Sequence, residues 1–479
     1  MLMVFPILLP VVGALLIFRE KDTLLLHKLT FLTVTLSAVL AVFAALLAQG
    51  HDLLLLKLSD TLSLCLAADR LSLFFVALVS FIWFFVEFHA FGYMKHEGNE
   101  PQFFGFFLLT YAAMIGLAFA KNAVTLYMFF ELMTLASMPM VLHNGSSRSR
   151  HAAFFYLGYS TLGVSLALLG FFLLAAQGND LTFVPKGGQL VGDPKTLLAA
   201  AFLIILGFGA KAGMVPLQMW LTEAHPVAPS PASAVMSGLI TKVGVLAILR
   251  CSFQLFGREM LRGTWVQTAI LGISILTIFT GSMLALREKV LKKRMAYSTI
   301  SNVSYVLFGL FTFTDLGIVG AFLQITFHAL AKDVLFLCAG SIIFATGSTR
   351  VDELKGIGRR MPVTMWCFAI ASLSLIGIPP MGGFAAKYCL ARGALAGGST
   401  LGLVGLVVLM LSALLTAFYL LPIVAAAFFP GRDFEAGQPC EVPKTMLVPQ
   451  LVFAGLTVLL GLFPNGLNAV FAILNGLVL

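Results

Sequence analysis

The sequence predicts an all-α polytopic membrane protein with about fourteen transmembrane helices and two inverted five-helix repeats that contain broken helices. The first reason is composition, because 59% of the 479 residues are hydrophobic, only 11% are charged and the mean hydropathy is +0.99. Soluble domains carry about 25% charged residues. The second reason is that apolar segments of about 20 residues, long enough to cross a bilayer, follow one another along nearly the whole chain. The third is that two of these segments are interrupted by proline and glycine beside a lysine.

Each expected span is an apolar run, and short loops separate the runs. In chain order the spans cover residues 2–18, 29–48, 71–94, 103–120, 122–141, 152–176, 197–220 (interrupted near Pro216), 230–252, 264–284, 295–313, 316–346, 363–395 (interrupted at Pro379 and Pro380), 400–428 and 446–473. The first run lacks the basic start and small-residue cleavage site of a signal peptide, so we expect it to be retained. Little more than Lys121 and Asn122 separates the fourth span from the fifth.

The two interrupted spans share one design, which predicts an internal repeat. GAKAGMVPL around Lys211 and GIPPMGGFAAKYCL around Lys387 each place helix breakers within a few residues of a lysine. Interrupted spans at corresponding places in two halves indicate inverted repeats with a coupling site at the breaks. The alternative is that two such kinks recur by chance in a very apolar chain. The expected domains are 1–100 (three helices), 101–255 (first repeat), 256–430 (second repeat) and 431–479 (a loop and the last helix).

The distribution of basic residues predicts the orientation of the chain. Roughly seventeen of the 30 lysines and arginines fall in odd-numbered loops and about seven in even-numbered ones, so the odd loops are expected in the cytoplasm. The net charge of +9 therefore follows from topology and does not indicate nucleic acid. With an even number of spans, both termini are expected on the outer side. The expected location is a prokaryotic plasma (inner) membrane, where the lipid bilayer surrounds the chain.

The sequence contains no pattern typical of a redox or catalytic centre. The six cysteines are scattered, with no CxxC pair and no Cys/His cluster at metal spacing. No nucleotide motif or nucleophile constellation is present either. We therefore expect no metal, no cofactor and no catalytic residue in the chain itself, which leaves a non-catalytic role within a larger complex.

Charged residues within the spans are the candidate functional residues, because a charge at the centre of a bilayer costs about 2.5 to 3.5 kcal/mol on insertion scales. The candidates are Glu131, Lys211, Lys242, His328, Lys332 and Lys387. A carboxylate facing a lysine in a hydrated bundle stays charged and can exchange protons. A lysine can release its proton at accessible pH, which an arginine cannot do.

The spacing of these residues suggests which of them meet. We expect Glu131 to interact with Lys211 across helices, with Thr134 on the same helix face as Glu131. Lys242 can approach Lys211 if the connection from Glu223 to Pro231 folds back tightly. The alternatives are a static ion pair and a lysine that extends to the membrane surface.

The second half offers a pair on one helix and a terminal lysine. His328 and Lys332 are four residues apart on one face, which suits a histidine relay between lysine sites. A buried histidine with satisfied hydrogen bonds is the alternative. Asp333 points elsewhere and is expected to be structural, while Lys387 follows the second break as a terminal site. Glu87 and His89, near the end of the third span, are functional or interfacial.

These residues lie in motifs that resemble the antiporter-like subunits of respiratory complex I, multi-subunit cation/proton antiporters and membrane-bound NiFe hydrogenases. The resemblance covers about residues 65–430, and the motifs that carry it are FELMTLASMPM, AKAGMVPLQMWLTEAHPVAPSPASAVMSG, MAYSTISN, FHALAKDVLFLCAGSI and LIGIPPMGGFAAK. The second motif, together with FATGSTRVDELKGIGRRMP, looks most like the large membrane subunit of formate-hydrogenlyase-type hydrogenases.

The resemblance implies a role for each candidate residue. Glu131 and Lys211 match the coupled Glu and Lys pair of the family, and Lys242 matches its bridging lysine. His328 with Lys332 matches the central relay, and Lys387 the terminal site.

Two positions depart from the pattern. Asn302 stands where complex I relatives commonly carry His and hydrogenase relatives an acid, and Lys387 stands where hydrogenase-type subunits often have Glu.

Three functions remain open on the sequence. The first is a proton-translocating subunit of a redox-driven complex, whose partners are other membrane subunits and peripheral subunits with iron-sulfur clusters. The second is a subunit of a multi-subunit Na⁺/H⁺ antiporter without a redox partner. The third is a membrane scaffold that conducts nothing. The lysines along the path favour protons over Na⁺, because a fixed cation repels Na⁺.

Overall fold

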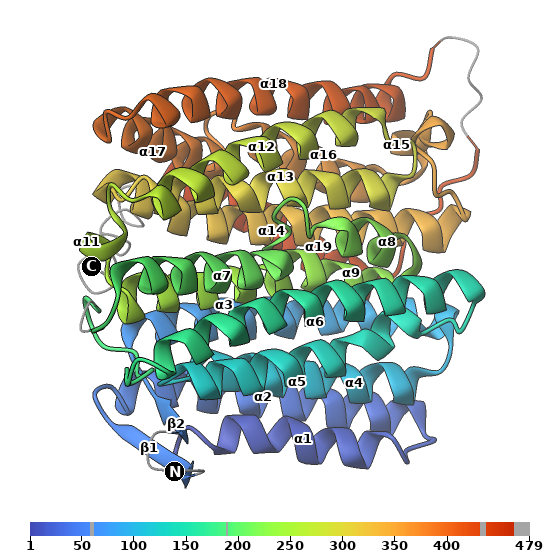
Figure 1. Ribbon diagram of the computed structural model, residues 1–479. Helices are drawn as coiled ribbons and strands as arrows, with labels where there is room; N and C mark the ends of the chain where they lie inside the picture. The colour runs from blue at the N-terminus through green and yellow to red at the C-terminus, as the bar shows by residue number, and fades with distance from the viewer. Residues whose placement is uncertain (58–61, 188–189, 432–436, 464–479) are drawn as a thin grey trace.

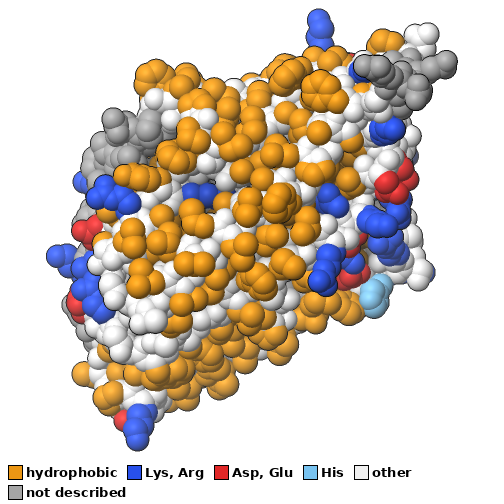
Figure 2. All heavy atoms as spheres, turned by 90° about the horizontal axis from the view of Figure 1, so that it is seen from above, with side chains coloured by type: hydrophobic (Ala, Val, Ile, Leu, Met, Phe, Trp, Pro, Cys, Tyr) orange, Lys and Arg blue, Asp and Glu red, His pale blue; other side chains and the backbone are white. Residues whose placement is uncertain are grey.

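The computed structural model describes residues 1–57, 62–187, 190–431 and 437–463. Its helices run side by side in one bundle (Figure 1), which confirms the all-α polytopic membrane fold. Within the described residues, eleven helices are long and apolar enough to cross a membrane. Large apolar side chains face outward along them; Phe154 is 73% exposed and Val407 67%. Figure 2 shows apolar side chains over most of one face, with most charged side chains at its two ends.

The N-terminal part consists of three helices and a hairpin. The elements are α1 (Phe5–Ile17), α2 (Thr23–Leu47), β1 (Asp52–Lys57), β2 (Ser63–Ala67) and α3 (Arg70–Glu97). The hairpin is antiparallel, and the sequence analysis did not predict it. Its first strand reads DLLLLK, an apolar run without the alternation that identifies a half-buried strand. The hairpin lies at the end of the bundle where the N-terminus also lies (Figure 1).

The middle of the chain contains the first broken helix. Its elements are α4 (Glu100–Ala118), α5 (Ala123–Leu142), α6 (Ser147–Ala175), α7 (Pro194–Ala212), α8 (Met219–Val227) and a continuous helix, Ser230–Leu255, made of α9 (Ser230–Val235), π-helical η1 (Met236–Ile240), α10 (Thr241–Leu249) and π-helical η2 (Arg250–Leu255). Asn122 caps α5 by accepting from the backbone N–H of Thr125, which explains why α4 and α5 are separate helices as predicted.

The remaining elements contain the second broken helix. They are α11 (Arg258–Leu261), α12 (Trp265–Arg287), α13 (Leu291–Phe311), α14 (Asp315–Thr346), η3 (Val351–Leu354), α15 (Ile357–Arg360), α16 (Pro362–Ile376), α17 (Gly382–Ala396), α18 (Thr400–Phe428) and α19 (Lys444–Leu462). The last expected span, 446–473, matches α19 up to Leu462, and its residues from 464 onward lie outside the described residues.

The two broken helices end their first halves in the same way. α7 is followed by Gly213 at φ 81° and α16 by Gly377 at φ 88°, a left-handed conformation that glycine adopts without steric cost. The prolines of each break then prevent the helix from continuing. The breaks therefore lie at the expected places and leave the last carbonyls of each first half free to accept hydrogen bonds.

The long helix α14 lies at the centre of the bundle, and its residues from Gly317 to Ile342 are almost all buried. It packs against α13, α16, α17 and α9.

An ion pair holds the start of α3 in place. Asp69 caps this helix by accepting from the backbone N–H of Ser72 at 2.7 Å. Arg250 of η2 donates to Asp69 at 2.9 Å and so ties the start of α3 to the end of the helix Ser230–Leu255.

Candidate functional site

The ammonium group of Lys211 is held among neutral hydroxyls at the end of α7. The residue is 1% exposed, and its Nζ donates to Thr134 Oγ1 at 3.0 Å, Tyr156 Oη at 2.7 Å and Ser160 Oγ at 3.1 Å. These three contacts match the three donors of a lysine ammonium group. The Tyr156 ring centroid also lies 4.0 Å from Nζ, a distance suited to a cation–π interaction. A cation at this position is therefore stabilised by neutral groups, and no carboxylate of the described residues contacts it.

Glu131 and Lys211 act on each other electrostatically, as the sequence analysis expected, but they are not in direct contact. No ion pair or hydrogen bond joins them within the described part of the chain. Glu131 is partly exposed on α5, and Thr134, three residues further along that helix, takes the contact with Lys211 instead. Glu131 and Thr134 lie about one turn apart on α5, and the lysine is bonded to Thr134.

Lys242 contacts the second half of the protein rather than Lys211. Its Nζ lies 2.6 Å from His328 Nδ1 on α14 and 2.6 Å from the Ser237 carbonyl oxygen. The backbones of α7 and α10 are close, because a Cβ added to Gly244 would lie 3.1 Å from the carbonyl carbon of Lys211. The two lysine side chains nevertheless bond to different helices. The expected direct approach of Lys242 to Lys211 is therefore not seen.

His328 and Lys332 share one face of α14, as the spacing predicted, but they have different partners. Lys332 Nζ donates to the Met295 carbonyl oxygen at 3.0 Å. The second ring nitrogen of His328, Nε2, is buried and has no hydrogen-bond partner among the described residues. A neutral imidazole that accepts from Lys242 at Nδ1 carries its proton at Nε2, so the ring has a donor available on its other side.

Asp333 is fully buried beside this group, where the sequence analysis expected a structural residue pointing elsewhere. Neither of its carboxylate oxygens has a hydrogen-bond partner in the described residues. A Cβ added to Gly238 of η1 would lie 2.3 Å from Asp333 Oδ1, so the carboxylate fits against that glycine. An acidic group therefore lies near the cationic group, and sequence spacing alone did not place it there.

Lys387 is held by the break between α16 and α17. Its Nζ donates to the carbonyl oxygens of Leu375 at 2.6 Å and Ile376 at 2.9 Å, the last residues of α16. The free carbonyls at the C-terminal end of a helix favour a cation. The break thus supplies acceptors that a continuous helix would use for its own hydrogen bonds.

A narrow space connects His328 with Lys387. It is lined by Asn302, Gln324, Phe327, His328, Ser374, Leu375, Gly383 and Lys387 and is too small for a water-sized sphere. Gln324 Nε2 donates to Asn302 Oδ1 at 3.2 Å, and Asn302 Nδ2 donates to the Ser298 carbonyl oxygen at 2.9 Å. A neutral amide pair therefore occupies the interval between the two candidate groups.

Some functional groups were missed or misplaced by sequence reasoning. Glu87 and His89 are both fully buried within the bundle; His89 Nε2 lies 3.1 Å from the Leu337 carbonyl oxygen. The hydroxyls of Tyr156 and Ser160 were not predicted as Lys211 partners. Serine and tyrosine are common in spans, and no charge marks them in the sequence. No group of three or more His, Cys, Asp or Glu able to hold a metal ion occurs in the described part of the chain.

The fold and the site together define a polytopic membrane protein with buried cationic side chains beside two broken helices. A family model described as "NADH:quinone oxidoreductase/Mrp antiporter, TM" matches residues 120–416. A second, described as the N-terminus of chain 5 of NADH-ubiquinone oxidoreductase (complex I), matches residues 58–104. The chain belongs to the NADH:quinone oxidoreductase/Mrp antiporter family of membrane proteins, which confirms the resemblance inferred from its motifs.

Individual relatives come from several branches of this family. The chain is 33% identical over 416 residues to NADH-quinone oxidoreductase subunit N of Desulforudis audaxviator (strain MP104C), covering 83% of this chain and 82% of that protein. It is 31% identical over 420 residues to hydrogenase-4 component B of Escherichia coli (strain K12), covering 83% of this chain and 62% of that protein. A chain of the Mrp complex from Dietzia sp. DQ12-45-1b has a TM-score of 0.87 at 21% identity, covering 100% of this chain and 96% of that chain, which supports the fold.

Proposed function

We propose that this chain is a proton-translocating antiporter-like subunit of a redox-driven membrane complex. The observation that carries this proposal is the contact of 2.6 Å between Lys242 Nζ and His328 Nδ1. It joins two titratable groups from α10 and α14, between Lys211 on one side and Lys387 on the other. Buried ionisable residues in membrane proteins mark ion pathways, because their cost requires a compensating role.

In the proposed mechanism, Lys211 is the loading site of the first half. Glu131 competes with Thr134 for its ammonium group, since both side chains project from neighbouring turns of α5. When Lys211 turns towards Glu131, it leaves its three hydroxyl partners and its affinity for the proton changes. A change at a neighbouring subunit that moves Glu131 would thus alter the charge of Lys211.

The proton then passes through the central group to Lys387. Lys242 donates to His328 Nδ1, and the imidazole releases its own proton from Nε2, so that the ring transfers one proton without accumulating charge. Lys332, on the same face of α14, sets the local charge beside His328 by gaining or losing its own proton. Lys387 is the last site that the proton reaches. Asn302 and Gln324 do not titrate, so water must enter the narrow space between His328 and Lys387 before a proton can pass. This requirement makes the interval a gate.

The partners and the membrane orientation form part of the same proposal. The relatives are named as subunits or components of larger assemblies, and this supports association with other membrane subunits. Peripheral subunits with iron-sulfur clusters would supply the redox energy. Both termini would lie outside the plasma membrane, with the domain boundaries at 1–100, 101–255, 256–430 and 431–479.

Cation/proton exchange is the second candidate. Similarity to the Mrp complex and to the putative antiporter subunit mnhD2 of Staphylococcus aureus (strain JH9), 28% identical over 448 residues, favours it. In this case the chain would move protons against Na⁺ and need no redox subunit. The lysines along the path argue for protons in this chain, because each fixed cation repels Na⁺.

The test uses the intact complex that contains this chain, purified from native membranes in mild detergent. Mass spectrometry identifies the co-purifying subunits, and iron-sulfur proteins among them support the redox-driven form. The complex is then reconstituted into liposomes, and a potassium diffusion potential drives proton uptake that an internal pH dye reports. Lys242→Met should reduce this uptake by about a hundredfold, the scale of a lost proton-transfer group.

The control is Lys195→Met, which removes an exposed lysine at the start of α7. It should leave proton uptake unchanged. Wild-type uptake by the Lys242→Met complex would contradict the proposed path. Proton movement driven by a Na⁺ gradient, with no redox subunit in the preparation, would favour the exchanger. The absence of any potential-driven uptake by the wild-type complex would favour the scaffold.

A further inference from the structure

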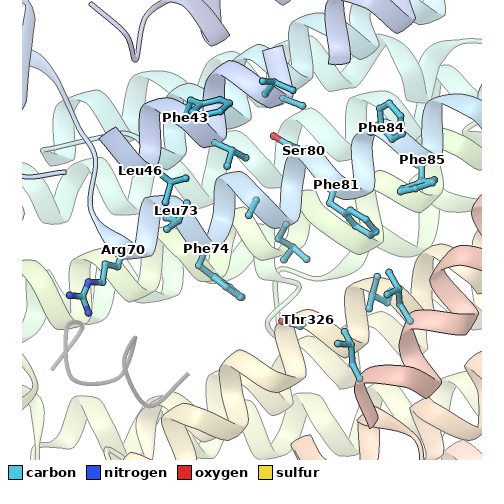
Figure 3. Close-up of a pocket in the computed structure, with 18 of the residues that line it drawn as sticks. Phe43, Leu46, Arg70, Leu73, Phe74, Ser80, Phe81, Phe84, Phe85 and Thr326 are labelled. Atoms are coloured by element: carbon cyan, nitrogen blue, oxygen red, sulfur yellow. The ribbon is translucent and has the colours of Figure 1, made fainter. Parts of the chain in front are cut away.

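An apolar groove runs along α3, and no residue of the proposed proton path lines it. It lies between α2, α3, α14 and α19 and has a volume of about 1210 Å³. Figure 3 shows a row of side chains along it, with Arg70 near one end and Phe84 and Phe85 near the other. The walls consist almost entirely of apolar side chains, including Phe43, Leu73 and Phe81. The groove therefore suits a long hydrocarbon chain.

A second cavity adjoins the groove at its Arg70 end. Gln49 and Arg70 line both cavities, so the apolar groove and the second cavity, of about 390 Å³, share a wall. The second cavity is more polar than the groove, and its lining carries more basic than acidic residues. Its charged lining residues are Arg70, Lys121, Lys186, Arg250, Asp52 and Asp69.

The charges of the second cavity are not balanced. Lys121 pairs with Asp52 at 3.2 Å, and Arg250 pairs with Asp69 at 2.9 Å. Arg70 and Lys186 have no ion-pair partner among the described residues, so two cations remain for a ligand. An arginine and a lysine together match the oxygens of a phosphate group.

The groove is longer than the hydrocarbon part of one leaflet of a bilayer. From Arg70 to Phe85, α3 rises by about 22 Å. Half of a hydrocarbon core of about 30 Å is about 15 Å, so the groove has room for the whole of an acyl chain that starts at the cationic end. The groove is thus open to a molecule with an apolar tail and an anionic head.

We propose that this composite site binds an anionic glycerophospholipid, with its phosphate at Arg70 and Lys186 and an acyl chain in the groove. A helix of a neighbouring subunit would fill the apolar part but would leave both cations uncompensated. A quinone carries no charged head and would do the same. The bound lipid would pack on Thr326 and Leu330 of α14, on either side of His328 in sequence. The site goes beyond the proposed function, because no residue of the proposed path lines it.

The test measures lipid that stays bound to the full-length protein in its complex. The complex is incubated with vesicles of phosphatidylethanolamine and phosphatidylglycerol, re-extracted in mild detergent, and its lipids are quantified by native mass spectrometry. Arg70→Gln should lower bound phosphatidylglycerol by about tenfold, the effect of one lost charge-assisted hydrogen bond. Ala77→Trp places a bulky ring in the groove and should lower the total bound phospholipid.

Matched controls are Lys195→Gln, which removes an exposed lysine, and Ala175→Trp, which adds a ring at an exposed position of α6. Both should retain wild-type binding. Equal retention of phosphatidylglycerol by wild type, Arg70→Gln and Ala77→Trp would overturn the proposal, as would a tightly bound quinone or a subunit helix found in the groove. Size-exclusion elution at the wild-type volume verifies folding of each variant. Proton uptake is measured separately, so a failure here is distinguishable from a failure of the proposed function.

Discussion

At the scale of single residues, the surroundings of Lys211 explain how a lysine can be buried without a carboxylate in contact. Three hydroxyl oxygens accept from its ammonium group, and no carboxylate contacts it in the described residues. A buried ion pair would hold the charge in place more firmly, since removing either partner leaves an uncompensated charge. Hydroxyls stabilise the ammonium group and can also donate to a neutral amine. Both protonation states of Lys211 therefore have suitable partners.

Replacement of Lys211 by arginine tests whether the proton itself matters at this position. The introduced guanidinium would keep the positive charge and could still donate to Thr134 or Tyr156, but it does not release its proton at accessible pH. We expect potential-driven proton uptake to fall by about a hundredfold, while the complex still assembles. The measurement is dye-reported uptake in liposomes.

Lys195→Arg serves as the control and should behave as wild type. If Lys211→Arg takes up protons at the wild-type rate, Lys211 acts as a fixed cation and not as a carrier. Thermal unfolding of both variants separates a loss of transport from a loss of fold, because overpacking by the larger guanidinium would lower the melting temperature.

At the scale of elements, the sequence predicted most of the helices because the apolar segments have the length of a bilayer. It predicted both breaks as well, since proline and glycine act locally. The hairpin β1–β2 was missed, because its stability comes from pairing that a short apolar run does not indicate. The partners of Lys242 were also missed, because the direction of a side chain depends on packing between α10 and α14, which lie far apart in the sequence.

The contact between Asp69 and Arg250 is a second feature of this scale, because it joins α3 to η2. The Asp69 side chain is partly buried, with 39% of its surface exposed. This partial burial alone would raise the pKa of the carboxyl. The Arg250 guanidinium, with hydrogen bonds from Arg250 and Ser72, outweighs this effect and holds the pKa well below its usual range. The contact therefore stabilises the fold when Asp69 is ionised.

This lowered pKa predicts a loss of stability in acid. A carboxyl with a lower pKa in the folded state contributes fully above its unfolded pKa of about 3.9, and the contribution disappears as the pH falls through the folded pKa. Asp69→Asn keeps a helix cap, because asparagine also caps, but it loses the charge and one of the two oxygens that accept from Arg250. We expect this variant to melt at a lower temperature at neutral pH and to show a weaker dependence on acid pH than wild type.

The measurement is thermal unfolding in detergent across a pH series. Asp193→Asn is the control, since Asp193 caps α7 in the same way but has no ion-pair partner in the described chain. It should change the acid dependence less than Asp69→Asn does. An unchanged acid dependence in Asp69→Asn would show that Arg250 does not hold the ionised carboxylate in solution.

At the scale of the whole molecule, the central contact joins two halves that the sequence described separately. The six candidate residues were chosen for their cost in a membrane, and the structure places three of them together: Lys242, His328 and Lys332. Lys211 and Lys387 lie apart from this group, at the two breaks. Hydroxyls of α5 and α6 accept from Lys211, and carbonyl oxygens of α16 accept from Lys387. The free-energy cost of placing a charge in a bilayer identifies such residues from the sequence. Which of their side chains contact one another depends on how the helices pack.

A path in series predicts non-additive effects of substitutions in the two halves. Lys242→Met and His328→Gln each interrupt the same route, so the double variant should transport protons no more slowly than the slower single variant. Independent routes in the two halves would instead give a product of the two single effects. The comparison uses initial rates of dye-reported uptake in liposomes containing equal amounts of complex. Lys195→Met combined with His328→Gln is the control, and it should match His328→Gln alone.

The winding of the helix Ser230–Leu255 has a consequence for Lys242. The nine residues of α10 that carry this lysine lie between two π-helical segments, η1 and η2. A π turn contains one residue more than an α turn. If the position of the π turn shifts along the helix from one side of a residue to the other, the side chain of that residue rotates by about 100° around the helix axis. The ends are anchored by the hydrogen bond from Ser233 Oγ to the His225 carbonyl oxygen and by the contact of Arg250 with Asp69. Local rewinding of this helix would thus change the direction in which Lys242 points, with no movement of either half of the protein.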